Sequence, residues 1–290
     1  MAIIAGAIQF GSSLSSFFLV RTTFSWLLAG GLLAASARAG ATPLPPDTAT
    51  ADVPHRHFAV ALNYGSNSAY FGRTQATPFP YLATNLTYVT KTGLFADVEL
   101  YNLLNTPLLL DETDLTVGWA GDLGKTLDAS VSYARFAFPA GSELVKSSVN
   151  NSLDAALGQD WGPFYSRLSA AYIFGKSVRS ADGFFTLENS RTIEIPHVFR
   201  APGYFTVEPT VSASAGTQSF EEAGLRRRRG PRAARRFGVV DYEFAVPVTY
   251  TLGKVSVVAG WRYVMPVNLP ANDEDSHALS IWTAGVTFSL

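Results

Sequence analysis

Carboxylates at alternate positions of apolar stretches are the residues of this sequence that could do chemistry together. Residues two apart in an extended chain point to the same side, so Asp97 and Glu99 share one face, as do Asp241 and Glu243. Carboxylates enclosed on such a face raise the local concentration of cations. Arginines on the same face could instead pair with them and close the enclosed space through salt bridges. Both interpretations stay open for the candidate pore-lining residues Asp97, Glu99, Asp114, Asp128, Asp154, Arg167, Glu208, Asp241, Glu243 and Arg262.

Two further groupings have the residue types of a catalytic or metal site but not the spacing. Ser276 and His277 follow the acidic run 273–275. Neighbouring residues cannot normally hydrogen-bond as nucleophile and base, and the run lacks the spacing of a calcium loop. His55 and His57 share one strand face without a third ligand. We therefore expect no catalytic residue, no metal and no cofactor, and a lipid hydrolase is the least favoured function.

An arginine-rich segment is the strongest charge feature of the chain. In a soluble protein such a run would indicate nucleic-acid binding or targeting, but an exported protein has no nucleic-acid partner. In an external loop the arginines would pair with phosphates of outer-membrane lipids and lipopolysaccharide. The alternative is a solvated insertion, which blocks of like charge usually form. The residues are Arg226, Arg227, Arg228, Arg229, Arg232, Arg235 and Arg236.

The composition excludes several kinds of site. The 290 residues include no cysteine, which rules out disulfides, thiol nucleophiles, iron–sulfur clusters and cysteine-ligated zinc. Charged residues make up 16% of the chain, against about 25% in an average soluble domain. The net charge of −1 gives no overall attraction to nucleic acid. A mean hydropathy of +0.13 lies between the values typical of soluble and of helical membrane proteins.

The elements that would position these side chains alternate with a period of two, which is the period of β-strands. Large apolar residues alternate with small or polar ones over 58–65, 94–101, 127–133, 168–174 and 240–248. In the last of these segments Val240 belongs to the apolar parity. A soluble sandwich would cover its outside with charge, whereas here the polar parity is mostly Gly, Ala, Ser, Thr and Asn. The apolar parity is therefore expected to face lipid.

Tight turns and long connections alternate along the chain, so all long loops fall at one end. The tight turns are Thr90–Gly93, Gly121–Lys125, Gly158–Pro163 and Leu252–Lys254; the long connections are Gly65–Pro80, Asn102–Thr113, Pro139–Ser147, Gly175–Gly183, Ala215–Gly238 and Pro266–Ala278. This organisation is typical of outer-membrane barrels. We predict an all-β fold, a transmembrane up-and-down antiparallel β-barrel of about twelve strands, with ten and fourteen as limits. Pro209 and Pro247 fall inside expected strands, where a proline removes a ladder bond and suggests a bulge or an error in the expected register.

Aromatic residues gather near the expected strand ends, where girdles of outer-membrane barrels lie. The final segment, 282–290, keeps one apolar parity up to Leu290. Such a terminal strand is what these barrels present to the barrel-assembly machinery, which we expect as a partner. The aromatic residues are Tyr64, Tyr88, Tyr101, Trp119, Tyr133, Tyr172, Tyr250, Trp261, Tyr263 and Trp282.

The N-terminal region has the features of an export signal. An apolar run over 24–35 follows Arg21 and precedes small residues up to Ala39. The run is shorter than the roughly 20 residues that a membrane-spanning helix needs. We interpret residues 1–39 as a cleaved signal peptide, in which 1–19 form an extension upstream of a start near Val20. Residues 40–56 are a Pro/Thr-rich linker and residues 57–290 the barrel.

Three stretches resemble the TorF-like porins, a group of small bacterial outer-membrane β-barrels. They are Ser66–Ala76 (SNSAYFGRTQA), Thr92–Asn102 (TGLFADVELYN) and Asp114–Pro139 (DLTVGWAGDLGKTLDASVSYARFAFP). The resemblance covers roughly residues 57–175, and the arginine-rich segment departs from it. It implies a diffusion channel of unassigned solute and supplies no catalytic residues.

Together these patterns predict a narrow passive channel for small hydrophilic solutes, cation-favouring, in the outer membrane of a Gram-negative bacterium. The alternative is a closed structural or surface-interaction barrel that transports nothing. A soluble secreted β-protein is the remaining possibility. Solute identity and oligomeric state do not follow from the sequence.

Overall fold

The computed structural model describes residues 57–69, 78–139, 142, 149–175, 181–196, 203–217, 237–268 and 277–290. The expected signal peptide and linker lie outside the described residues, as do the arginine-rich segment and Ser276. Every regular element in the described part is a β-strand. The strands are β1 (His57–Gly65), β2 (Tyr81–Val89), β3 (Leu94–Leu103), β4 (Glu112–Asp122), β5 (Leu127–Ala137), β6 (Val149–Asp160), β7 (Tyr165–Gly175), β8 (Asp182–Ser190), β9 (Ile193–Pro196), β10 (Tyr204–Val207), β11 (Thr210–Gly216), β12 (Gly238–Leu252), β13 (Val255–Pro266) and β14 (Leu279–Ser289).

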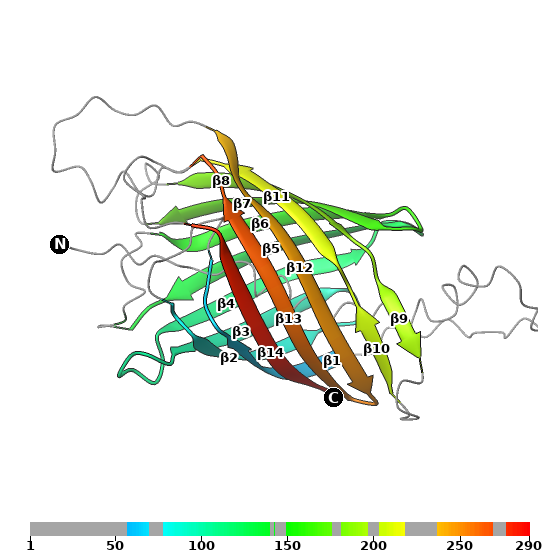
Figure 1. Ribbon diagram of the computed structural model, residues 1–290, viewed down its shortest axis with the longest axis horizontal. Helices are drawn as coiled ribbons and strands as arrows, with labels where there is room; N and C mark the ends of the chain where they lie inside the picture. The colour runs from blue at the N-terminus through cyan, green and yellow to red at the C-terminus, as the bar shows by residue number, and fades with distance from the viewer. Residues whose placement is uncertain are drawn as a thin grey trace, which may run out of the picture.

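The strands form one closed antiparallel barrel. Strands that follow each other in the chain pair with each other, except β8 with β9 and β10 with β11, and β1 pairs with β14 to close the ring. Strands β8 and β9 are two segments of one barrel strand, and β10 and β11 are two segments of the next. The pairing shows this, because β8 pairs with β11 and β9 pairs with β10. Counted in this way the barrel has twelve strands, wound obliquely around one axis (Figure 1). The predicted fold class and strand number are confirmed.

The prolines interrupt the hydrogen-bond ladder without shifting it. The segments β10 and β11 keep the same register against β12 on either side of Pro209, so the predicted bulge at the prolines is wrong. The Glu208 N–H donates to the Pro247 carbonyl over 3.1 Å, and the Arg191 N–H to the Pro209 carbonyl over 3.2 Å. The return bonds cannot form because proline has no N–H. Each proline therefore removes one ladder bond and leaves the register intact.

Short turns lie at one end of the barrel and long connections at the other, as predicted. The turn after β2 closes through Gly93, whose φ of 83° is left-handed; a Cβ there would lie 2.1 Å from the Ala120 carbonyl oxygen. The connection between β9 and β10, residues 197–203, lies at the short-turn end but exceeds a tight turn in length. We call the two ends the short-turn end and the long-loop end.

The two faces of the wall differ as the alternation predicts. Large apolar side chains on the outer face are exposed, among them Val117, Val131 and Leu168 at 51–56%. Small and polar side chains face the barrel axis, which we call the inner face. The outward aromatic residues include Trp261, Trp282 and Tyr263, whose rings lie 6.3–6.4 Å apart across β13 and β14. This distribution fits a wall whose outer side meets lipid.

Two aromatic or apolar residues lie on the opposite face from the one predicted. Tyr101 is 4% exposed and faces inward beside Tyr81, so it belongs to no outer girdle. Val240 is 2% exposed and packs on the inner side. The β11–β12 pairing shifts by one residue between Ser214 and Ala215, which turns the end of β12 and breaks its alternation. Parity counted along one strand cannot anticipate such a bulge.

Candidate functional site

All ten candidate lining residues lie on the inner face of the barrel. Six of them are almost completely buried, with 1–7% of the side chain exposed: Asp97, Glu99, Asp114, Arg167, Asp241 and Asp128. The other four are less buried: Asp154, Glu208, Glu243 and Arg262. The strand register separates most of the ten into two groups on different parts of the wall. Their role in lining a pore stays a prediction.

The first group, which we call the acidic cluster, consists of Asp97 and Glu99 on β3 and Glu112 and Asp114 on β4. Glu99 lies directly opposite Asp114 in the β3–β4 pair. Their exposed fractions are between 1% and 7%. Like charges directly opposite one another destabilise a strand pair. The arrangement therefore concentrates carboxyl groups where little water reaches them.

Asp97 differs from the other members of the cluster because its carboxylate is held by neighbours. The Asn85 amide donates to Asp97 Oδ2 over 2.9 Å, and the Thr87 hydroxyl donates to Asp97 Oδ1 over 2.5 Å. The Thr87 hydroxyl also lies 2.7 Å from Asn85 Oδ1. Three inner positions of β2 and β3 thus form one hydrogen-bonded unit that fixes the Asp97 side chain.

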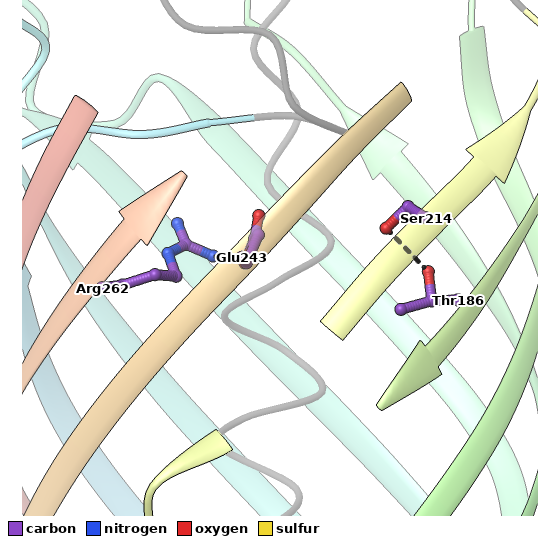
Figure 2. Close-up of polar contacts among 4 residues, drawn as sticks. All are labelled: Thr186, Ser214, Glu243 and Arg262. Atoms are coloured by element: carbon purple, nitrogen blue, oxygen red, sulfur yellow. Dashed lines mark hydrogen bonds and ion pairs between the residues drawn. The ribbon is translucent and has the colours of Figure 1, made fainter. Parts of the chain in front are cut away.

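The second group combines acids with both inner arginines. Arg262 on β13 lies 3.5 Å from Glu243 on β12, measured from Nη1 to Oε2, and the two side chains face each other from adjacent strands (Figure 2). Glu188 on β8 interacts electrostatically with Arg167 and with Glu243. Figure 2 also shows the Thr186 hydroxyl donating to Ser214 Oγ over 3.1 Å. An internal network of salt bridges in this part of the wall stays a prediction, to which the Arg262–Glu243 pair would contribute.

A smaller polar network lies toward the short-turn end. The Tyr165 hydroxyl contacts both carboxylate oxygens of Asp128, at 2.9 and 3.1 Å. Arg167 donates from Nη2 to Ser130 Oγ over 3.0 Å. Gly158 makes room for the tyrosine, since a Cβ there would lie 1.8 Å from the hydroxyl oxygen. These contacts connect β5, β6 and β7 across the inner face.

An apolar layer covers the inner face at the long-loop end. One cluster contains Ala134, Phe136, Ile173, Phe184 and Val240; a second contains Tyr81, Ala83, Tyr101 and Leu103. Phe138, which follows β5, packs against both clusters and joins them. Ala69, from the connection after β1, packs on Val264 and Ile281. Side chains thus narrow this end of the barrel above the acidic cluster.

The sequence analysis missed Glu112 and Glu188 as inner-face acids. Glu112 was placed inside the connection 102–113, but β4 begins with it, and it has the same parity as Asp114. Extending that alternation by one step would have found it. Glu188 has no comparable signal, because proline and polar residues obscure the periodicity between 184 and 203.

The structure brings no catalytic or metal centre together in its described part. His57 begins β1, and His277 is exposed just before β14. Their expected partners, His55, Ser276 and the acidic run 273–275, lie outside the described residues, as does the arginine-rich loop. No group of three or more His, Asp or Glu side chains among the described residues could hold a metal ion. Nor does a helix long and apolar enough to span a bilayer occur in this part of the chain.

Comparison with known proteins gives likeness at the level of overall shape. No protein-family model matches the sequence, and no curated protein is similar to it. Among solved structures, a KdgM porin is 9% identical, with a TM-score of 0.47, covering 80% of this chain and 99% of its own. KdgM has also been described in complex with disordered oligogalacturonate, at 8% identity and the same TM-score. An outer-membrane channel from Pseudomonas putida F1 is 12% identical, with a TM-score of 0.48, covering 86% of this chain and 100% of its own. The chain is thus similar in shape to small outer-membrane β-barrels.

Proposed function

We propose that this protein is a narrow passive channel of the outer membrane that favours small cationic hydrophilic solutes. The observation that carries the proposal is the closed twelve-strand barrel, with an apolar outer face and an inner face on which carboxylates outnumber arginines. An enclosed tube of low dielectric constant strengthens the field of such carboxylates and enriches cations inside. Because the inner face holds hydrogen-bonding groups, solutes that cross it must be polar.

The proposed location follows from the solvent that the outer face needs. A belt of Leu, Val and Phe side chains that is half exposed on every side of a barrel is unstable in water, whereas lipid accommodates it. The β1–β14 pair closes the ring, so that among the described strands only the short β9 has an unpaired side. Lipids and lipopolysaccharide are the expected partners of this belt and of the arginine-rich loop, and the barrel-assembly machinery is the expected partner during insertion.

Planar-bilayer recording of the purified protein tests the proposal. A gradient of KCl across the membrane should give a current whose reversal potential has the sign of potassium preference. Replacing the second-group acids, Glu188→Gln with Glu243→Gln, should move that potential toward zero. The matched control is Glu194→Gln, an acid near the short-turn end. Absence of current at either polarity, from protein shown to be folded, would refute the channel.

The apolar layer favours a second function, a closed barrel whose outer loops bind a partner. The clusters joined by Phe138 lie across the inner face at the long-loop end and oppose free passage. A closed barrel predicts no conductance for the wild type. A trisaccharide of uronic acids is a useful anionic probe. An open channel with acidic inner walls should exclude it. Its permeation would contradict the proposed preference for cations.

A further inference from the structure

The acidic cluster contains acceptor atoms that lack donors. Neither carboxylate oxygen of Glu99 has a partner at full hydrogen-bond geometry among the described residues, although the Tyr101 side chain interacts with this carboxylate. Glu112 Oε1 and Asp114 Oδ1 lack partners among these residues as well. Glu99 is 1% exposed, so water does not replace the missing donors in this arrangement. Leaving buried acceptors unsatisfied costs about 1–3 kcal/mol each, and more for charged groups. The cluster is therefore incomplete without a group that brings hydrogen-bond donors.

The neighbouring inner positions also bring no positive charge. Glu99 lies opposite Asn85 on β2, and Asp114 lies opposite Phe136 on β5. Asp97 lies opposite Thr87, which already donates to it. The two arginines that the described strands place on the inner face, Arg167 on β7 and Arg262 on β13, each interact with acids of the second group. No described residue at these paired positions supplies a charge that balances the acidic cluster.

We propose that the acidic cluster binds the ammonium group of a small organic cation, with Glu99 and Asp114 as its central acceptors. An ammonium group has three N–H donors and one positive charge, so it can fill three of the four acceptors that lack donors. The rings of Tyr81 and Tyr101, 5.7 Å apart, lie at the adjoining inner positions toward the long-loop end. Aromatic faces attract organic cations, and the apolar part of the solute would contact them.

A chelated metal ion fits the same cluster less well. Calcium takes six to eight oxygen ligands that converge on one point. The described carboxylates include no group of three that converges in this way. Asp97 is held by Asn85 and Thr87 and is not free to turn toward a metal. A donor-bearing organic cation does not need such convergent ligands, because each N–H group can bond to a different oxygen.

The inference rests on the proposed channel, since the solute reaches the cluster from the lumen. The apolar layer of Tyr81, Tyr101 and Leu103 would have to shift for the solute to enter, because Tyr101 lies opposite Glu112 and interacts with Glu99. Binding during permeation should then appear as a saturable reduction of the potassium current. A solute that passes without binding would leave that current unchanged.

The test uses the full barrel in planar bilayers with propylammonium as the probe. Propylammonium should reduce the wild-type potassium current with saturation, whereas neutral 1-propanol should not. Glu99→Gln should raise the half-blocking concentration about tenfold or more, because charge-assisted hydrogen bonds contribute about 1.5–3 kcal/mol. Asp114→Asn should act in the same direction. The matched control, Asp154→Asn, also removes one inner carboxylate, but on β6 and outside the cluster.

Three outcomes would overturn the inference: equal shifts in Glu99→Gln and Asp154→Asn, equal block by 1-propanol, or block by Mg²⁺ at lower concentration than by propylammonium. Each variant is first checked for folding by its heat-modifiable gel migration. Calorimetric titration of propylammonium into detergent-solubilised protein separates this inference from the channel. Binding that Glu99→Gln abolishes, in a barrel that conducts nothing, would support the site and refute the channel. Conductance without binding would support the channel and refute the site.

Discussion

Glu99 and Asp114 face each other across the β3–β4 pair, on the inner side of the barrel and with almost no exposure. They are 15 residues apart in the chain, and the β3–β4 hairpin brings them together. No arginine or lysine occupies the inner positions paired with them on β2 and β5. When both carboxyl groups are ionised, this like-charge pair destabilises the strand pairing.

The pair predicts that neutralising one acid stabilises the barrel. Glu99→Gln should increase the free energy of unfolding by about 1 kcal/mol at alkaline pH, where carboxyl groups carry charge, because it removes a directly opposed like-charge contact. The gain should shrink in acid, where protonation already removes the repulsion. Urea unfolding in detergent at both pH values measures this. Asp154→Asn is the control, since its carboxylate accepts a hydrogen bond from Ser152 over 2.7 Å and its loss should not stabilise. A destabilised Glu99→Gln at alkaline pH would contradict the prediction.

The apolar layer predicts that removing one ring widens the long-loop end. Phe138 joins the two inner clusters, so Phe138→Ala should increase single-channel conductance. The lost packing should cost about 2 kcal/mol of stability. The control is Leu153→Ala on the outer face, where the side chain is 48% exposed and meets lipid rather than the lumen. If both variants conduct like the wild type, the layer does not limit passage.

The apolar outer face predicts that the effect of an introduced charge on stability depends strongly on where the charge lies. Val131, near the middle of β5, is 53% exposed on the outer face. Val131→Arg should destabilise the barrel in lipid vesicles by about 2–4 kcal/mol, because a charge near the bilayer midplane is poorly solvated. Leu123→Arg, in the turn between β4 and β5, should have little effect. Equal stability of the two variants in vesicles would argue that no membrane surrounds β5.

The prolines predict a local weakness in the ladder between β10 and β12. Pro247 accepts a bond from the Glu208 N–H but cannot return one. Pro247→Ala restores an N–H at this position, which should form the return bond and slow hydrogen exchange of the Glu208 amide. Hydrogen exchange followed by mass spectrometry measures this on peptides covering 204–216. Pro266→Ala, at the end of β13, is the control. Faster exchange over 204–216 in Pro247→Ala would show that the ring stiffens the strand more than the lost bond weakens it.

The sequence alone was sufficient for the fold class and for the face of each candidate lining residue. The period of two is a local property, because Asp97 and Glu99 must share a side once their segment is extended. The lengths of the connections then show which strand ends lie at the same end of the barrel. The same reasoning does not identify Glu112 as an inner-face residue, because the first residue of a strand is set by its pairing with a neighbouring strand rather than by composition. It also placed Tyr101 in an outer girdle although its parity with Glu99 assigns it to the inner face.

Only the tertiary structure decided which inner residues meet. Register depends on hydrogen bonds between strands that are distant in the chain, and alternation along one strand carries no information about it. That is why the opposition of Glu99 and Asp114, the pairing of Arg262 with Glu243, and the inward turn of Val240 at the bulge could not be foreseen. The sequence determined that acids line an enclosed face; the register determined which of them have partners and which have none.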